Sequence, residues 1–96
     1  MQLRADAVRF VLAQGLPAVI EVVGGSMSPT IAKGTKVDVA PLGEADALSV
    51  GEIVLLATAS DILLLHRVMA EFEEGGARFV IHQGDAASSI FAVSAR

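Results

Sequence analysis

Cysteine, tryptophan and tyrosine are absent from this sequence of 96 residues, and proline occurs only three times. Without cysteine, the chain cannot form a disulfide scaffold, a thiolate metal site or a cysteine nucleophile. Its two histidines, His66 and His82, belong to no clear carboxylate constellation at ligand spacing. We therefore predict no metal site and no cofactor.

Basic charge is also scarce, because seven lysines and arginines stand against eleven acidic residues, which leaves a net charge of −4. The basic residues are scattered, which argues against a nucleic-acid-binding surface. No apolar run reaches the roughly 20 residues that span a bilayer. The first ten residues carry Arg4, Asp6 and Arg9, so they do not resemble a secretory signal. We expect a soluble, cytoplasmic chain that could associate with a membrane only through a partner or a further segment.

Apolar residues make up 53% of the sequence, mostly alanine, valine and leucine. A disordered chain does not contain this much material for a core. The length suits one small domain and is too short for two, so residues 1–96 are predicted to form a single domain.

Hydrophobic periodicity predicts one helix followed by strands. Residues 3–14 have helical spacing, and Gly15 and Pro17 suit the end of a helix. Alternating or continuous apolar runs then predict five strands. Their expected ranges are Ala18–Val23, Thr35–Leu42, Glu52–Thr58, Ile62–Phe72 and Ala77–His82, with a hairpin turn at residues 73–76. The predicted fold class is mainly β, with an antiparallel sheet system and one N-terminal helix.

The last residues, SSIFAVSAR, contain neither a turn signal nor a polar tail. We expect the closing strand of the domain to follow Arg96.

Between the first two predicted strands lies the segment GGSMSPT, residues 24–30. Glycine frees the backbone from steric restriction and proline fixes it, so this cluster marks the end of a strand. Two interpretations remain open at this point. The segment is either a plain loop or a turn that presents the Ser26 hydroxyl as a nucleophile.

Three segments in order carry a resemblance to a known family. They are GGSMSPTIAKGTKVDV, VGEIVLL followed by LLHRVM, and FVIHQGDA. Together they resemble the signal peptidase I-like and LexA-like serine peptidases over residues 18–86. The sequence LLHRV is most similar to the endoplasmic-reticulum and archaeal signal peptidases, in which histidine replaces the lysine base. The resemblance implies a signal-peptidase-like antiparallel β fold and a peptide or precursor-protein substrate that binds as an added strand.

The resemblance assigns Ser26 as the nucleophile, His66 as the base and Asp85 as the acid that orients it. It also places Gly24, Gly25 and Met27 in the loop that holds the substrate and the oxyanion. The chemistry is consistent, because a serine hydroxyl needs a neighbouring base and histidine is largely neutral near pH 7. We therefore expect Ser26 Oγ within hydrogen-bond reach of the His66 ring, with Asp85 approaching the same ring.

For other residues of these segments we expect structural roles. Met27 and Pro29 are expected to pack and to shape the loop, His82 to be structural, and Arg67 to support the loop or to pair with a carboxylate. Asp85 could also simply cap a turn.

Two hypotheses for function remain. The first is a soluble serine endopeptidase with a Ser26–His66 dyad. The alternative is a catalytically impaired peptide-binding or regulatory domain on the same fold. It is motivated by the absence of any carboxylate from residues 86–91, where the histidine-type signal peptidases carry a second aspartate.

Overall fold

The computed structural model of the protein describes residues 5–43, 45–57, 63–86 and 91–96. These residues form one short helix and six strands, so the predicted mainly β class is confirmed. The elements are α1 (Ala5–Ala13), β1 (Ala18–Glu21), β2 (Lys36–Val39), β3 (Ile53–Ala57), β4 (Leu63–Glu74), β5 (Ala77–Gln83) and β6 (Ala92–Ala95).

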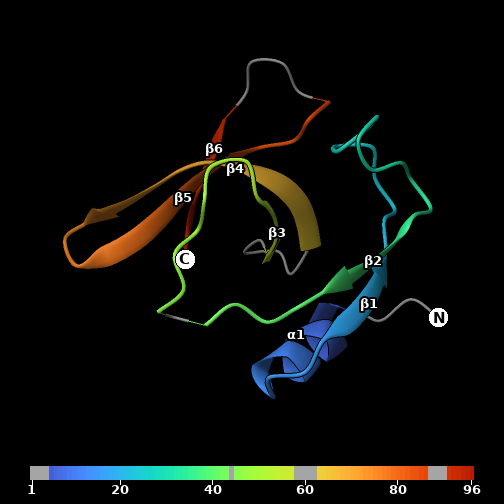
Figure 1. Ribbon diagram of the computed structural model, residues 1–96, viewed down its shortest axis with the longest axis horizontal. Helices are drawn as coiled ribbons and strands as arrows, with labels where there is room; N and C mark the ends of the chain where they lie inside the picture. The colour runs from blue at the N-terminus through green and yellow to red at the C-terminus, as the bar shows by residue number, and fades with distance from the viewer. Residues whose placement is uncertain (1–4, 44, 58–62, 87–90) are drawn as a thin grey trace.

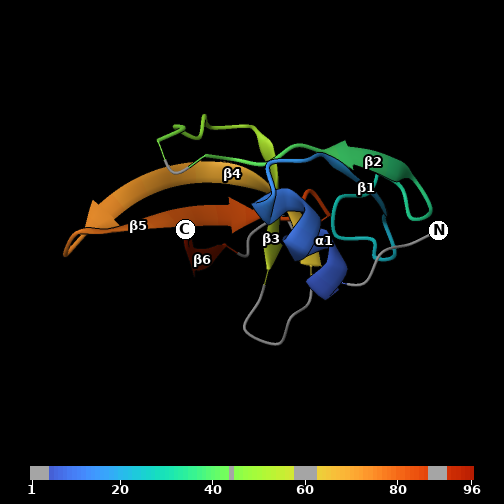
Figure 2. The same cartoon turned by 90° about the horizontal axis from the view of Figure 1, so that it is seen from below.

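The strands form two antiparallel sheets (Figure 1). One contains β1 and β2, and the other has the strand order β3-β4-β5-β6. β4 and β5 are joined by the predicted hairpin, in which Gly75 and Gly76 both have positive φ angles of 61° and 81°. Glycine adopts this region without the steric cost of a Cβ atom. The tip of this hairpin extends away from α1 and the smaller sheet (Figure 2).

One apolar cluster packs the helix onto both sheets. Val8 of α1 is fully buried beside Ala18 and Ile20 of β1. Leu63 and Leu65 of β4 pack against the same cluster, so one face of β4 contributes to this core. The alternation predicted for β4 places His66 and Val68 on the opposite face. The core thus fixes which side of β4 is left for a functional site.

β6 is a strand that the sequence pattern does not predict. It pairs antiparallel with β5, and Phe79 faces Ala95 while His82 faces Ala92. Its four residues, AVSA, offer no strong alternation and few β-branched side chains. The strand forms where the edge of β5 provides hydrogen-bonding partners, and residue patterns within the segment do not encode that edge.

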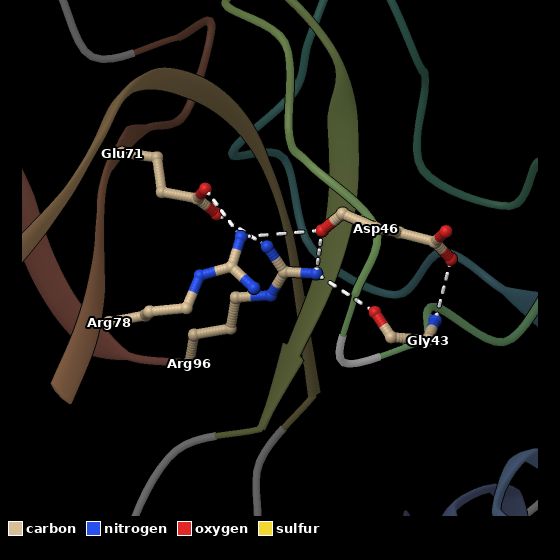
Figure 3. Close-up of polar contacts among 5 residues, drawn as sticks. All are labelled: Gly43, Asp46, Glu71, Arg78 and Arg96. Atoms are coloured by element: carbon tan, nitrogen blue, oxygen red, sulfur yellow. Dashed lines mark hydrogen bonds and ion pairs between the residues drawn. The ribbon is translucent and has the colours of Figure 1, made fainter. Parts of the chain in front are cut away.

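A cluster of charged side chains ties the chain between β2 and β3 to the larger sheet (Figure 3). The Glu71 carboxylate accepts hydrogen bonds from Arg78 at 2.7 Å and Arg96 at 2.6 Å. The two guanidinium groups also donate to backbone carbonyls of this connection, at Asp46 from both arginines and at Gly43 from Arg96. These hydrogen bonds hold the pKa of Glu71 below its ordinary value. The ionised carboxylate thus links β4, β5 and the residue after β6.

Candidate functional site

The serine loop, residues 22–35, connects β1 to β2 and lies beside the segment that follows β5 (Figure 1). Its anchor is Met27, which is only 1% exposed. The Met27 sulfur accepts a hydrogen bond from the Asp85 backbone N–H at 3.4 Å, and the Ser26 carbonyl accepts one from the Ala86 N–H at 2.9 Å. The expectation that Met27 packs is confirmed, while the neighbouring Ser26 remains exposed.

Gly84 explains how closely the loop and this segment can approach. A Cβ atom added to Gly84 would lie 2.5 Å from the Ser26 carbonyl oxygen and 3.1 Å from the Ser26 Cβ. The first distance is far shorter than normal van der Waals contact, so only glycine fits here without displacement of the loop. Packing against the serine loop therefore requires glycine at position 84.

The Ser26 hydroxyl donates to the backbone carbonyl of Leu65 at 3.5 Å. Leu65 lies just beyond the end of the β4–β5 ladder, whose last pair is Arg67 with Gln83. Among the described residues, the expected hydrogen bond between Ser26 and His66 is not formed. The loop nevertheless brings the hydroxyl to the strand position next to His66, from 39 positions away in the sequence.

The His66 ring contacts a second histidine. His66 Nδ1 lies 2.8 Å from His82 Nδ1, and the ring centroids are 5.0 Å apart. His82 is 2% exposed, and its Nε2 lies 2.7 Å from Ser94 Oγ. Burial lowers the pKa of both histidines below the ordinary value, and the charge of His66 lowers that of His82 further. His82, predicted to be structural, is thus the hydrogen-bond partner of the expected base.

The Asp85 carboxylate is held by other partners. Arg67 donates to its two oxygens from Nε at 2.8 Å and from Nη2 at 2.7 Å, and the Thr30 hydroxyl donates at 2.6 Å. The expected contact of Asp85 with the His66 ring is therefore absent from the described part of the chain. A guanidinium binds a carboxylate through two parallel hydrogen bonds, which a single imidazole N–H does not match. The expected pairing of Arg67 with a carboxylate is confirmed.

These hydrogen bonds, first from Arg67 and then from Thr30, lower the pKa of Asp85 to about 2. The ordinary value in an unfolded chain is about 3.9. A depressed folded-state pKa contributes stability that is present above about pH 4 and is lost as the pH falls toward 2. We predict that wild type loses stability more steeply across this window than Asp85→Asn does. At pH 7 the variant is expected to melt a few degrees lower.

Thermal melts followed by circular dichroism at pH values from 2 to 7 measure this difference. Asp38→Asn, at an exposed carboxylate of β2, is the matched control for loss of one negative charge. Parallel curves for wild type and Asp85→Asn would show that the ion pair with Arg67 does not stabilise the fold.

The Ser26 backbone N–H and the space before this residue are open to a ligand. Among the described residues, none accepts a hydrogen bond from the Ser26 backbone N–H. Cβ atoms added to Gly24 and Gly25 would meet no heavy atom within 4 Å, so the space before Ser26 is free. An unpaired N–H beside a nucleophile can stabilise an oxyanion.

A mostly apolar pocket of about 690 Å³ lies on the side of β4 that faces the core. Its lining includes Ile31 of the serine loop and Leu65, whose carbonyl accepts the Ser26 hydrogen bond. Two carboxylate residues, Asp38 and Glu52, also contribute to the lining. Because Leu65 and His66 point to opposite faces of β4, this pocket lies across the strand from the His66 ring.

No group of three or more histidine, aspartate or glutamate side chains within the described ranges is placed to hold a metal ion. Across those same ranges, no helix has the length and apolar character needed to cross a bilayer. Comparisons of the chain with protein-family models, with curated proteins and with solved structures find no match.

Proposed function

We propose that this protein is a serine endopeptidase of the signal-peptidase-like type, with Ser26 as nucleophile and His66 as base. The observation that carries the proposal is the hydrogen bond from the Ser26 hydroxyl to Leu65, the residue before His66 on β4. It brings an exposed hydroxyl beside a histidine whose Nε2 has no partner among the described residues. Catalytic hydrogen bonds are often long or misaligned in unliganded enzymes and tighten when substrate binds.

The proposed reaction is acyl transfer to Ser26. Because burial lowers the pKa of His66, the ring is neutral at pH 7 and its Nε2 can take the proton from Ser26 Oγ. The oxygen attacks the peptide carbonyl carbon, and the backbone N–H of Ser26 donates to the resulting oxyanion. His66 then gives its proton to the leaving amine as the C–N bond breaks. A water molecule, activated by the same base, hydrolyses the acyl-serine.

The proposed substrate is a peptide or precursor protein with small residues near the scissile bond. The open space before Ser26 supports the close approach of an extended backbone. A peptide added along a strand gains main-chain hydrogen bonds, while shallow pockets select its side chains.

Cleavage of a peptide panel, followed by mass spectrometry, tests the proposal. Wild type is expected to give discrete products, Ser26→Ala none, and His66→Ala at least about 10² times less, since general-base catalysis contributes that much or more. Ser28→Ala, a second exposed serine in the same loop, is the matched control and should retain wild-type turnover. Equal turnover by wild type and both dyad variants would eliminate the dyad.

A second candidate is a peptide-binding domain without efficient chemistry. It is favoured by the two hydrogen bonds that hold Asp85 on Arg67, because no carboxylate then contacts the His66 ring within the described ranges. This candidate predicts that peptides bind in titration calorimetry while no product depends on Ser26. The same peptide panel therefore separates the two functions.

A further inference from the structure

A line of three polar side chains crosses one face of the larger sheet. In the β4–β5 register His82 faces Val68, so His66 is its diagonal neighbour two residues away. In the β5–β6 register His82 faces Ala92, so Ser94 is its diagonal neighbour on the other side. Side chains two residues apart on a strand share a face. The sheet therefore aligns His66, His82 and Ser94, and the two contacts measure 2.8 and 2.7 Å.

His82 occupies a position that packing alone would fill with an aliphatic residue. Its cross-strand neighbour Val68 is fully buried, and Val80, two residues earlier on β5, is 1% exposed. A buried imidazole is tolerated only if its nitrogens find partners. Both ring nitrogens of His82 have one, at His66 and at Ser94. The buried histidine therefore acts as a link between these two side chains.

The contact between two Nδ1 atoms restricts where the protons lie. One nitrogen must carry hydrogen and the other must present its lone pair. For His66 to accept the Ser26 proton at Nε2, that nitrogen must be bare and the ring hydrogen must lie on Nδ1. His82 then accepts at Nδ1, carries its own hydrogen on Nε2, and donates it to Ser94 Oγ.

We propose that His82, held by Ser94, is the positioning residue for His66, in the place that the resemblance assigns to Asp85. This inference rests on the proposed function. The His82 lone pair fixes the His66 tautomer and ring orientation through Nδ1. When the Ser26 proton reaches His66 Nε2, the Nδ1–H already points at an acceptor, so neither ring has to turn. His82 stays neutral throughout, because a proton on its Nδ1 would oppose the N–H of His66.

Two readouts test this assignment in the wild-type protein and in folded variants. Long-range ¹H–¹⁵N correlation spectra of the imidazole rings at neutral pH should show hydrogen on Nδ1 of His66 and on Nε2 of His82. In peptide cleavage, His82→Leu should lower kcat about 10- to 100-fold with little change in KM, as expected for one hydrogen bond to a charged group.

Conservative variants separate positioning from packing. His82→Asn keeps an acceptor near the Nδ1 position and should recover part of the lost kcat, whereas His82→Leu should not. Ser94→Ala should lower kcat less than His82→Leu does, and Ser94→Thr, which keeps the hydroxyl, should restore it. Ser49→Ala, at an exposed serine outside the site, is the control. If replacing the buried His82 by leucine prevents folding, the kcat of Ser94→Ala still tests the inference.

A hydrogen on Nε2 of His66 in the spectra would overturn the inference, as would an unchanged kcat in folded His82→Leu and in Ser94→Ala. The spectra do not depend on catalysis. If wild type cleaves no peptide but the tautomers are as stated, the peptidase assignment fails while the orientation of His66 by His82 stands. If wild type cleaves through Ser26 and the tautomers are reversed, only the role of His82 fails.

Discussion

Met27→Ala is expected to lower the free energy of unfolding by about 2–5 kcal/mol, the usual cost of truncating a buried methionine. Met27 is among the largest fully buried side chains of the described chain, with 1% exposure. Truncation removes its transfer free energy and leaves a cavity beneath the serine loop. It also removes the sulfur that accepts the Asp85 backbone N–H. Because Met27 follows Ser26, the loop is expected to lose its position as well, and Ser26-dependent cleavage should fall with stability.

Urea denaturation measures this loss in the free energy of unfolding. Two further variants serve as comparisons. Met27→Leu nearly conserves volume and should cost less than about 1.5 kcal/mol. Val50→Ala truncates an apolar side chain that is 73% exposed, and should stay within about 0.5 kcal/mol of wild type. If Met27→Ala were as stable as Val50→Ala, Met27 would not be the anchor of the serine loop.

Gly84→Ala is expected to destabilise the fold by about 1–3 kcal/mol, the usual cost of forcing an atom into a packed site. The new Cβ would lie 2.5 Å from the Ser26 carbonyl oxygen, a backbone atom that no rotamer change can move. The same carbonyl accepts the Ala86 N–H, so withdrawal of the loop would strain or break that hydrogen bond. Ser26 is expected to shift away from Leu65, and cleavage should decrease more than global stability explains.

Denaturation and backbone amide chemical shifts together test this effect. Gly25→Ala is the matched control for stability, because its added Cβ would meet no heavy atom within 4 Å and its φ angle is not in the left-handed region. We expect shift changes around residues 26–31 in Gly84→Ala. Unperturbed shifts there, with wild-type stability, would contradict the close approach of Gly84 to Ser26.

Local sequence patterns were sufficient for most elements of the fold. The apolar spacing of residues 3–14, followed by Gly15, predicts the helix observed at Ala5–Ala13. The alternation in KVDV predicts the faces of β2, where Val37 and Val39 are partly buried and the charged neighbours are exposed. Gly75 and Gly76 predict the β4–β5 hairpin. These features depend on interactions between near neighbours, which a short pattern records directly.

The site was only partly predictable. The sequence resemblance brings Ser26 and the strand of His66 into one hypothesis, and the loop indeed contacts that strand at Leu65. The resemblance does not indicate which hydrogen-bond donors surround the Asp85 carboxylate. Asp85 faces Arg67 and Thr30, which lie 18 and 55 positions away in the sequence. Which of the possible partners a carboxylate binds depends on the distances between side chains in the folded chain.

The sequence by itself determined the mainly β class, the single helix, the hairpin and the buried Met27 next to Ser26. Only the tertiary structure decided that β6 pairs with β5, that His82 rather than Asp85 contacts His66, and that Gly84 must lack a side chain. The physical reason is that these last features depend on the pairing register of the strands and on contacts between distant segments. Strand pairing aligns His66, His82 and Ser94 diagonally, and hydrogen bonds between such distant residues depend on alignments that no local pattern specifies.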